Sequence, residues 1–138
     1  MRVSLVAAVV AAGLVLSGCR SATLQNVENA PYGDTGIASA RQLTLDEYAR
    51  AIVRAGTQRN WVFQSVAPGH LEGRVDVRGK HNAVVDVYYD AEVYSIVYKS
   101  SQNLKYDAAE NTIHPNYNSW VQLLSQDIRA EVQRARAS

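Results

Sequence analysis

The sequence has a single cysteine, Cys19, among its 138 residues, and no excess of charge of one sign. One cysteine excludes an intramolecular disulfide and a zinc site built from several cysteines. The formal net charge is +1, so the chain has no strong acidic or basic character. A chain of this length predicts one domain and excludes a TIM barrel, a two-domain enzyme and a multi-span transporter. Hydrophobic residues make up 47% of the chain, which argues against wholesale disorder.

An uncharged apolar run extends from residue 3 to residue 16, directly after Arg2. A membrane span needs about 20 residues, so this run is short for a span and typical of a signal peptide. It ends in Leu16-Ser17-Gly18-Cys19, which resembles the bacterial lipobox, whose cysteine is lipidated and becomes the new first residue. We therefore predict a signal peptide over residues 1–18 and lipidation of Cys19. The alternative is an ordinary secretory signal followed by a chance cysteine.

The residue after the predicted lipidation site is Arg20. By resemblance to the sorting rule of Gram-negative lipoproteins, a residue other than aspartate here implies the outer membrane, with the chain facing the periplasm. Removal of residues 1–18 takes away Arg2 and no acid, which leaves 13 basic and 13 acidic residues. This balance disfavours nucleic acid as a partner. The expected partners are the membrane, through acylated Cys19, and a protein of the cell envelope.

The next segment predicts a flexible tether over residues 19–42. It is rich in small and polar residues, is interrupted by Pro31, Gly33 and Gly36, and shows no apolar period. The alternative is that Tyr32 or Ile37 packs on the domain as an extra strand.

Two helices are predicted to flank the rest of the chain. Thr44 and Glu47 form a capping-box pattern, followed by apolar residues at helical spacing as far as the expected stop at Gly56. The second helix is expected from about residue 117 to residue 134, where apolar residues recur at every fourth position from Trp120 to Val132.

Four β-rich segments lie between these helices, at residues 61–66, 71–78, 83–89 and 94–100. Residues 71–78 alternate strictly between Gly or apolar residues and charged ones, which is typical of a strand with one buried face. The connections are too short for parallel crossovers, so neighbouring strands are expected to be antiparallel. The sequence therefore predicts an α+β domain over residues 43–138. Its element order is α-β-β-β-β-α, in a two-layer sandwich with both helices packed on one face of the sheet.

The C-terminal third carries two distinctive segments. Residues 98–106 read YKSSQNLKY, and residues 113–121 read IHPNYNSWV. Together with the lipobox, they resemble a family of small bacterial outer-membrane lipoproteins that have SSxNLxY and IHxxYNxWV segments and no assigned activity. The resemblance implies a lipid-anchored envelope protein and brings no catalytic residue with it.

The region from residue 103 to residue 120 is the strongest candidate for binding. It combines flat aromatic side chains with amides, a combination that suits recognition of peptides or sugars. In the alternative interpretation, Tyr117 and Trp120 belong to the core and the asparagines cap the helix and the loop. The candidate binding residues are Asn103, Tyr106, His114, Tyr117, Asn118 and Trp120.

No pattern in the sequence predicts catalysis. The three histidines, at positions 70, 81 and 114, are too dispersed to indicate a metal site. A serine triad would have to be drawn from Ser100 or Ser101, His114 and Asp107, and no Gly-x-Ser-x-Gly motif surrounds either serine. We predict no catalytic residue, no metal and no cofactor. The leading interpretation is a non-catalytic interaction or assembly module of the envelope, and the alternative is a binder of a small ligand, glycan or peptide that uses the Tyr/Trp/Asn-rich loop.

Overall fold

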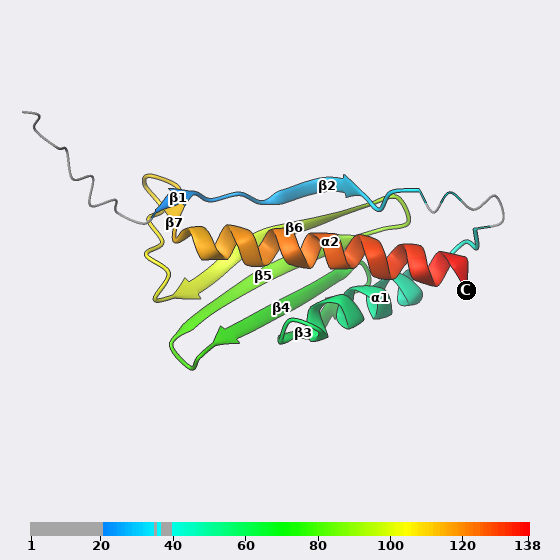
Figure 1. Cartoon of the computed structure of the whole chain (residues 1–138), viewed down its shortest axis with the longest axis horizontal. Helices are drawn as coiled ribbons and strands as arrows, with labels where there is room; N and C mark the ends of the chain where they lie inside the picture. Colours follow the sequence, from blue (N-terminus) through cyan, green and yellow to red (C-terminus); the bar gives the residue numbers. More distant parts are fainter. Residues whose placement is uncertain (1–20, 35, 37–39) are drawn as a thin grey trace, which may run out of the picture.

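The computed structural model describes residues 21–34, 36 and 40–138 (Figure 1). The predicted signal peptide, residues 1–18, and the predicted lipidation site, Cys19, lie outside the described residues. The elements are β1 (Ala22–Thr23), β2 (Val27–Pro31), α1 (Leu45–Thr57), β3 (Trp61–Ala67), β4 (His70–Val77), β5 (His81–Tyr89), β6 (Val93–Gln102), β7 (Thr112–Ile113) and α2 (Pro115–Ala137).

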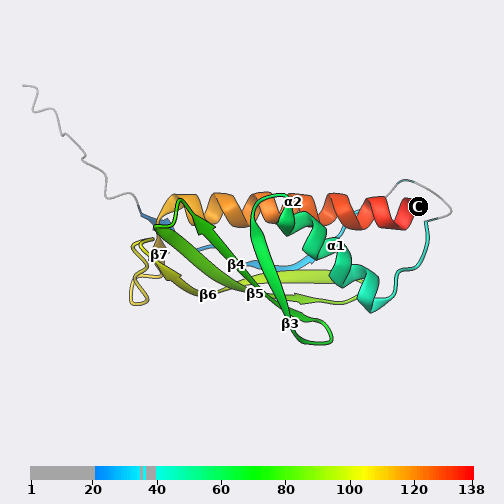
Figure 2. The ribbon, with the colours of Figure 1, turned by 90° about the horizontal axis from the view of Figure 1, so that it is seen from below.

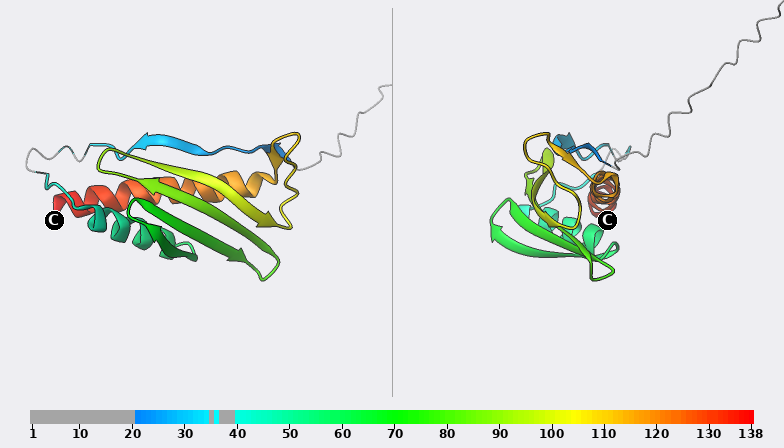
Figure 3. Two further views of the ribbon diagram at one scale, coloured as in Figure 1. Left: turned by 180° about the vertical axis from the view of Figure 1, so that it is seen from behind. Right: turned by 90° about the vertical axis from the view of Figure 1, so that its left-hand side faces the viewer.

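The predicted class is confirmed at the level of an α+β fold with a five-stranded antiparallel sheet and two helices. The spatial order of the sheet is β2-β6-β5-β4-β3, and β3 to β6 follow one another through tight turns, as expected. Both helices lie on the same side of this sheet (Figures 2 and 3). In the described part of the chain, neither helix is long and apolar enough to span a membrane.

The predicted order α-β-β-β-β-α is incomplete. Strand β2 precedes α1 and adds a fifth strand beside β6, while β1 and β7 pair in a separate two-stranded sheet. The extra strands are too short and too polar to show an apolar period. They form because the backbone N–H and C=O groups of β6 pair with β2 and those of β7 pair with β1. A pattern within one short segment does not reveal such pairing.

The prediction of a flexible tether over residues 19–42 is wrong for residues 22–32. Tyr32, directly after β2, has only 1% of its surface exposed. Its hydroxyl donates a 2.8 Å hydrogen bond to the carbonyl of Asp90, and the Gln133 side chain donates a 2.9 Å bond to the Tyr32 carbonyl. The alternative in which Tyr32 packs on the domain is the correct one, whereas Ile37 lies outside the described residues.

Side chains also hold β2 where its pairing with β6 shifts register. Asn26 accepts a 2.9 Å hydrogen bond from the backbone N–H of Tyr98. Ser95 accepts a bond of the same length from the backbone N–H of Asn29. These bonds satisfy groups that a regular ladder would pair directly, so β2 stays attached through its irregular part.

Helix α1 begins as predicted and ends later than predicted. The Thr44 side chain accepts from the backbone N–H of Glu47 at 3.2 Å, and the Glu47 carboxylate accepts from the backbone N–H of Thr44 at 2.8 Å. Gly56 does not stop the helix, which continues to Thr57. This glycine is buried against the ring of Phe63, where a Cβ atom would clash, so its role is to let α1 approach β3 closely.

Helix α2 starts two residues earlier than predicted, at Pro115. Its N-cap is His114, whose Nδ1 accepts a 3.1 Å hydrogen bond from the backbone N–H of Asn116. The interpretation in which an asparagine caps the start of this helix is therefore wrong. Histidine is an uncommon cap, and Pro115 at the first helical position supplies the local start signal that the apolar spacing misses.

The core lies between the helices and the sheet, and three tyrosines close it at the end where α2 finishes. The ring centroid of Tyr32 lies 5.0 Å from that of Tyr48 and 5.2 Å from that of Tyr94. The Arg136 guanidinium lies 5.3 Å from the centroid of Tyr32 and donates a 2.8 Å bond to the Tyr48 hydroxyl. Residues from β2, α1, β6 and α2 thus share one cluster.

We predict that Tyr32→Ala lowers the free energy of unfolding by about 3–5 kcal/mol, the range for truncating a buried aromatic side chain. The matched control is Tyr106→Ala, because Tyr106 is 42% exposed and its loss should cost far less. Urea unfolding of both variants measures the difference. Equal midpoints for Tyr32→Ala and the parent chain would mean that the N-terminal segment is not part of the folded unit.

Candidate functional site

The six predicted binding residues are spread over several local structures. Asn118 holds the N-terminal segment, because its side chain accepts a 3.0 Å bond from the Gln25 backbone N–H and donates a 2.9 Å bond to the Thr23 carbonyl. Asn103 has a positive φ of 58° and donates a 2.5 Å bond to the carbonyl of Lys80. Both amides are therefore engaged in joining loops of the domain to one another.

Tyr106 and Tyr117 belong to a row of tyrosines that runs inward from the surface. Tyr106 is exposed, and its ring centroid lies 4.3 Å from that of Tyr98. Tyr98 in turn meets Tyr117 edge-on, with centroids 5.5 Å apart. Tyr117 is fully buried, and its hydroxyl has no hydrogen-bond partner among the described residues. The structure thus favours the core interpretation for Tyr117 and leaves only the Tyr106 edge of this row open to a ligand.

His114 and Trp120 line a common cavity. We call it the Trp120 pocket; its volume is about 350 Å³, and it lies between the turn that joins β4 to β5 and the start of α2. His81 also lines it and its Nδ1 donates a 2.8 Å bond to the Asn103 carbonyl. The pocket lining is Val77, Arg78, His81, Leu104, His114, Asn116 and Trp120.

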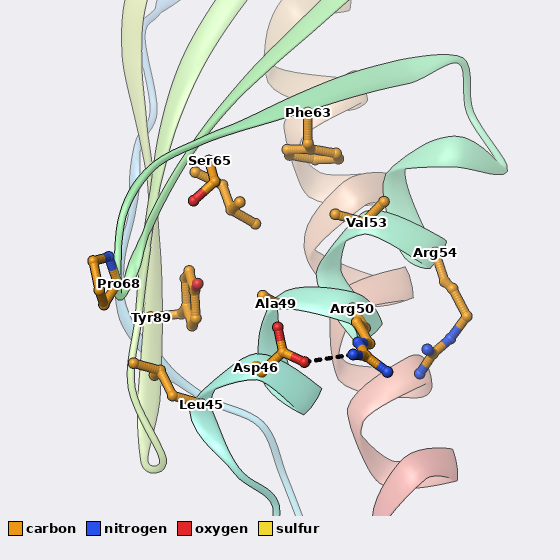
Figure 4. Close-up of a pocket in the computed structure, with 11 residues that line it drawn as sticks. Leu45, Asp46, Ala49, Arg50, Val53, Arg54, Phe63, Ser65, Pro68 and Tyr89 are labelled. Atoms are coloured by element: carbon orange, nitrogen blue, oxygen red, sulfur yellow. Dashed lines mark ion pairs between the residues drawn. The ribbon is translucent and has the colours of Figure 1, made fainter.

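A larger cavity lies between α1 and β3, which we call the α1–β3 groove (Figure 4). Its volume is about 820 Å³. One wall is formed by Leu45, Ala49 and Val53, which follow one another at intervals of four residues along α1. Phe63 and Tyr89 contribute to the wall on the side of the sheet. The complete lining is Leu45, Asp46, Ala49, Arg50, Val53, Arg54, Phe63, Ser65, Pro68, Leu71 and Tyr89.

The charged residues of this groove lie on α1. Asp46 and Arg50 form an ion pair of 2.8 Å, one helical turn apart, and both side chains are well exposed (Figure 4). Arg54 is directed instead towards Glu131 of α2, at 3.4 Å. The groove therefore has an apolar lining with polar groups on the helix, a composition that suits an apolar side chain or ligand.

The groove borders an open edge of the sheet, because β3 is the last strand on that side. Two large apolar side chains of β3 are exposed, Val62 at 72% and Val66 at 54%. An edge strand has backbone N–H and C=O groups that are free to pair with another chain. This site was not predicted from the sequence. The signal that could have revealed it is the second apolar stripe on α1, formed by Leu45, Ala49 and Val53 beside the buried stripe.

The outer face of the sheet carries a network of charges. His70 and Asp86 are joined at 2.8 Å, and Lys99 pairs with Glu72 at 2.5 Å. The hydrogen bond with Glu72, together with the charge of Asp86, raises the pKa of Lys99 above its usual range. Each carboxylate has a partner within the network, which is the ordinary arrangement of a solvated sheet face.

The side chains of the conceivable triad have other partners. His114 accepts through Nδ1 from Asn116, Ser101 bonds the Tyr98 hydroxyl at 2.8 Å, and Asp107 caps its own turn. Over residues 21–34, 36 and 40–138, no group of three or more histidine, cysteine or acidic side chains is arranged to hold a metal ion.

We predict that Tyr117→Phe leaves the free energy of unfolding unchanged or raises it by about 1 kcal/mol, because it removes a buried hydroxyl that has no partner. Burial raises the pKa of Tyr117 above the ordinary tyrosine value of about 10. Above that pH the unfolded chain loses this proton and the native state keeps it, so stability falls as pH rises. Chemical unfolding at pH 8 and pH 10.5 should show a smaller loss for Tyr117→Phe than for the parent chain. An equal loss in both would show that Tyr117 ionises as readily in the native state.

The chain matches no protein-family model, and no curated protein or solved structure is significantly similar to it. Its function is therefore inferred from its own residues and from the groove, the open strand edge and the Trp120 pocket.

Proposed function

We propose that this chain is a lipid-anchored lipoprotein of the bacterial envelope, acylated at Cys19 and held on the periplasmic face of the outer membrane. Its α+β domain, a two-layer sandwich, acts as a non-catalytic interaction module that binds a segment of a partner protein. The order of charge, apolar run and small residues before Cys19 supports the anchor. The α1–β3 groove beside an open strand edge is the observation that carries the binding role.

The occupant that fits this site is an extended peptide of the partner protein. The open edge of β3 offers backbone hydrogen bonds to an added strand. Alternate side chains of such a strand point to one face, so they can enter the groove between Phe63 and Val53. An apolar residue at every second position of the partner segment matches this lining.

A small apolar ligand is the second candidate occupant. The groove volume of about 820 Å³ lies within the range of small-molecule sites, and Leu45, Phe63 and Leu71 give it an apolar lining. The aromatic and amide residues between positions 103 and 120 support this alternative less well, because Tyr117 is buried and the Asn103 and Asn118 side chains are bonded within the domain.

We expect a photoreactive amino acid at Val53 and another at Val62 to crosslink in cells to one short segment of the same envelope protein. Both positions are exposed and flank the site, so they should fold normally. Mass spectrometry of the crosslinked peptides identifies the segment. Adding Ala49→Glu should reduce the yield at both positions at least about tenfold, because it places a charge among apolar groups.

The matched control is Ala130→Glu, an exposed position on α2 away from the groove. It should leave the crosslinks unchanged. Recovery of a small molecule from the groove, or of unrelated peptides that differ between Val53 and Val62, would overturn the peptide-binding role.

We expect intact mass measurement of membrane-extracted protein to show a mature chain that begins with an acylated Cys19. Each buried CH₂ of an acyl chain contributes about 0.8 kcal/mol, so several chains on one residue anchor it stably. Cys19→Ala should release the protein from membranes with its thermal unfolding midpoint unchanged. Unmodified Cys19 in membrane-bound protein would refute the anchor.

A further inference from the structure

We propose that the domain contacts the membrane directly, and that Arg78, Lys80 and Lys105 bind the phosphate groups of anionic lipid headgroups. These residues lie at one end of the molecule, which we call the anchor end. It comprises β1, β7, the turn 78–80, the loop 103–111 and the first turn of α2, and it lies opposite the C-terminus (Figure 1). The inference rests on the proposed function in one respect, the acylation of Cys19.

The chain between the proposed anchor at Cys19 and the first strand is short. Strand β1 starts at Ala22, three residues after Cys19. A fully extended chain spans at most about 3.6 Å per residue, so Ala22 lies within about 11 Å of the acylated residue. Pairing with β7 and the two hydrogen bonds of Asn118 fix β1 on the domain. The part of the domain that carries β1 is therefore held close to the headgroups.

The basic side chains of the anchor end differ from most of the others because they form no ion pair within the described residues. Most basic side chains elsewhere are engaged: six form ion pairs with carboxylates, namely Arg41, Arg50, Arg54, Arg59, Lys99 and Arg134. The side chains of Arg78, Lys80 and Lys105 are exposed and make no ion pair or hydrogen bond within the described part of the chain. Each cation near an anionic membrane surface strengthens binding about fivefold.

The Trp120 pocket also lies at the anchor end. Arg78, His81 and His114 line it, and its lining contains no carboxylate. His114 accepts through Nδ1, so in the neutral ring its Nε2 carries the proton and can donate to a phosphate oxygen. His81 donates through Nδ1, so in the neutral ring its Nε2 is an acceptor and does not bond a phosphate oxygen. A guanidinium donates to two phosphate oxygens at once, and a half-buried indole suits the interface between headgroups and protein.

The acidic residues of the anchor end do not cancel this charge within the pocket. Asp76, Asp107 and Glu110 are exposed, and none of them lines it. The Asp107 carboxylate is already engaged, since it accepts from the backbone N–H groups of residues 109 and 110. The pocket and the turn 78–80 therefore present only cationic and neutral groups to a headgroup.

The test uses the mature chain from residue 19 with Cys19→Ser, which keeps every described element and removes the acyl anchor. Binding is measured by co-sedimentation with vesicles of phosphatidylcholine, with and without an equal part of phosphatidylglycerol. We expect binding to the anionic vesicles and little to the zwitterionic ones. Arg78→Glu with Lys80→Glu should lower the anionic binding at least about tenfold.

Arg74→Glu is the matched control, because Arg74 is also exposed and unpaired within the described residues but lies in the middle of β4. It should retain binding within about twofold of the parent chain, since its charge is not at the anchor end. An equal loss in Arg74→Glu and in the double variant would overturn the assignment to the anchor end.

Three further outcomes would overturn the inference. The first is that the folded chain does not bind anionic vesicles; if the native protein nevertheless carries an acylated Cys19, the anchor stands and only the lipid contact falls. The second is that inorganic phosphate alone binds as tightly as the anionic surface, which would assign the pocket to a soluble anion. The third is native protein without acylation, which would refute the proposed anchor and, with it, this contact.

Discussion

The pairing of β2 with β6 is the contact that places the domain relative to its N-terminal chain. It brings Tyr32 into the core, where its hydroxyl bonds the carbonyl of Asp90 and its ring packs on those of Tyr48 and Tyr94. Without this strand, the chain would leave the domain at the start of α1. With it, the chain leaves at β1, at the other end of the molecule (Figure 1). The irregular part of β2 depends on the Asn26 and Ser95 side chains, so a few polar bonds determine which end of the domain is nearest the proposed anchor at Cys19.

The helix layer explains why a groove is left open beside β3. Helix α1 is tied to α2 through the buried carboxylate of Glu131, which accepts from Gln58 at 2.8 Å and from Arg54 at 3.4 Å. Removing a partner from such a buried charge is costly, so α1 is held firmly on that side. Towards the sheet, contact is closest where Phe63 packs over Gly56 and Gly73. The first turns of α1 carry Leu45 and Ala49 with no strand packed tightly against them, and the α1–β3 groove occupies that space.

Local signals in the sequence were sufficient for the elements that depend on local interactions. The capping box of Thr44 and Glu47 predicts the start of α1, and the alternation over residues 71–78 predicts β4 with its buried face. The start of α2 was missed because His114 caps it through a ring nitrogen. Strand β2 was predicted only as an alternative, because its stability comes from backbone groups of β6 more than 60 residues away in the chain. Such pairing leaves no period in the sequence of residues 27–31.

The candidate site was the hardest feature to predict, for the same reason. Aromatic and amide residues between positions 103 and 120 have the chemistry of a binding loop, but the fold uses most of them internally. Asn118 holds β1, Tyr117 fills the core, and Asn103 joins two turns.

Two groups of side chains without internal partners lie at different places on the described part of the molecule. Apolar groups line the groove beside β3, and the cations of the turn 78–80 lie at the end of the molecule that carries β1 (Figure 1). A protein attached through its N-terminal residue must present one end to the membrane and the remainder to the aqueous phase. Unpaired cations are tolerated at low cost in either place, but an apolar groove is useful only where a partner can reach it. The separation of the two groups therefore agrees with an anchor next to β1 and a binding surface directed away from it.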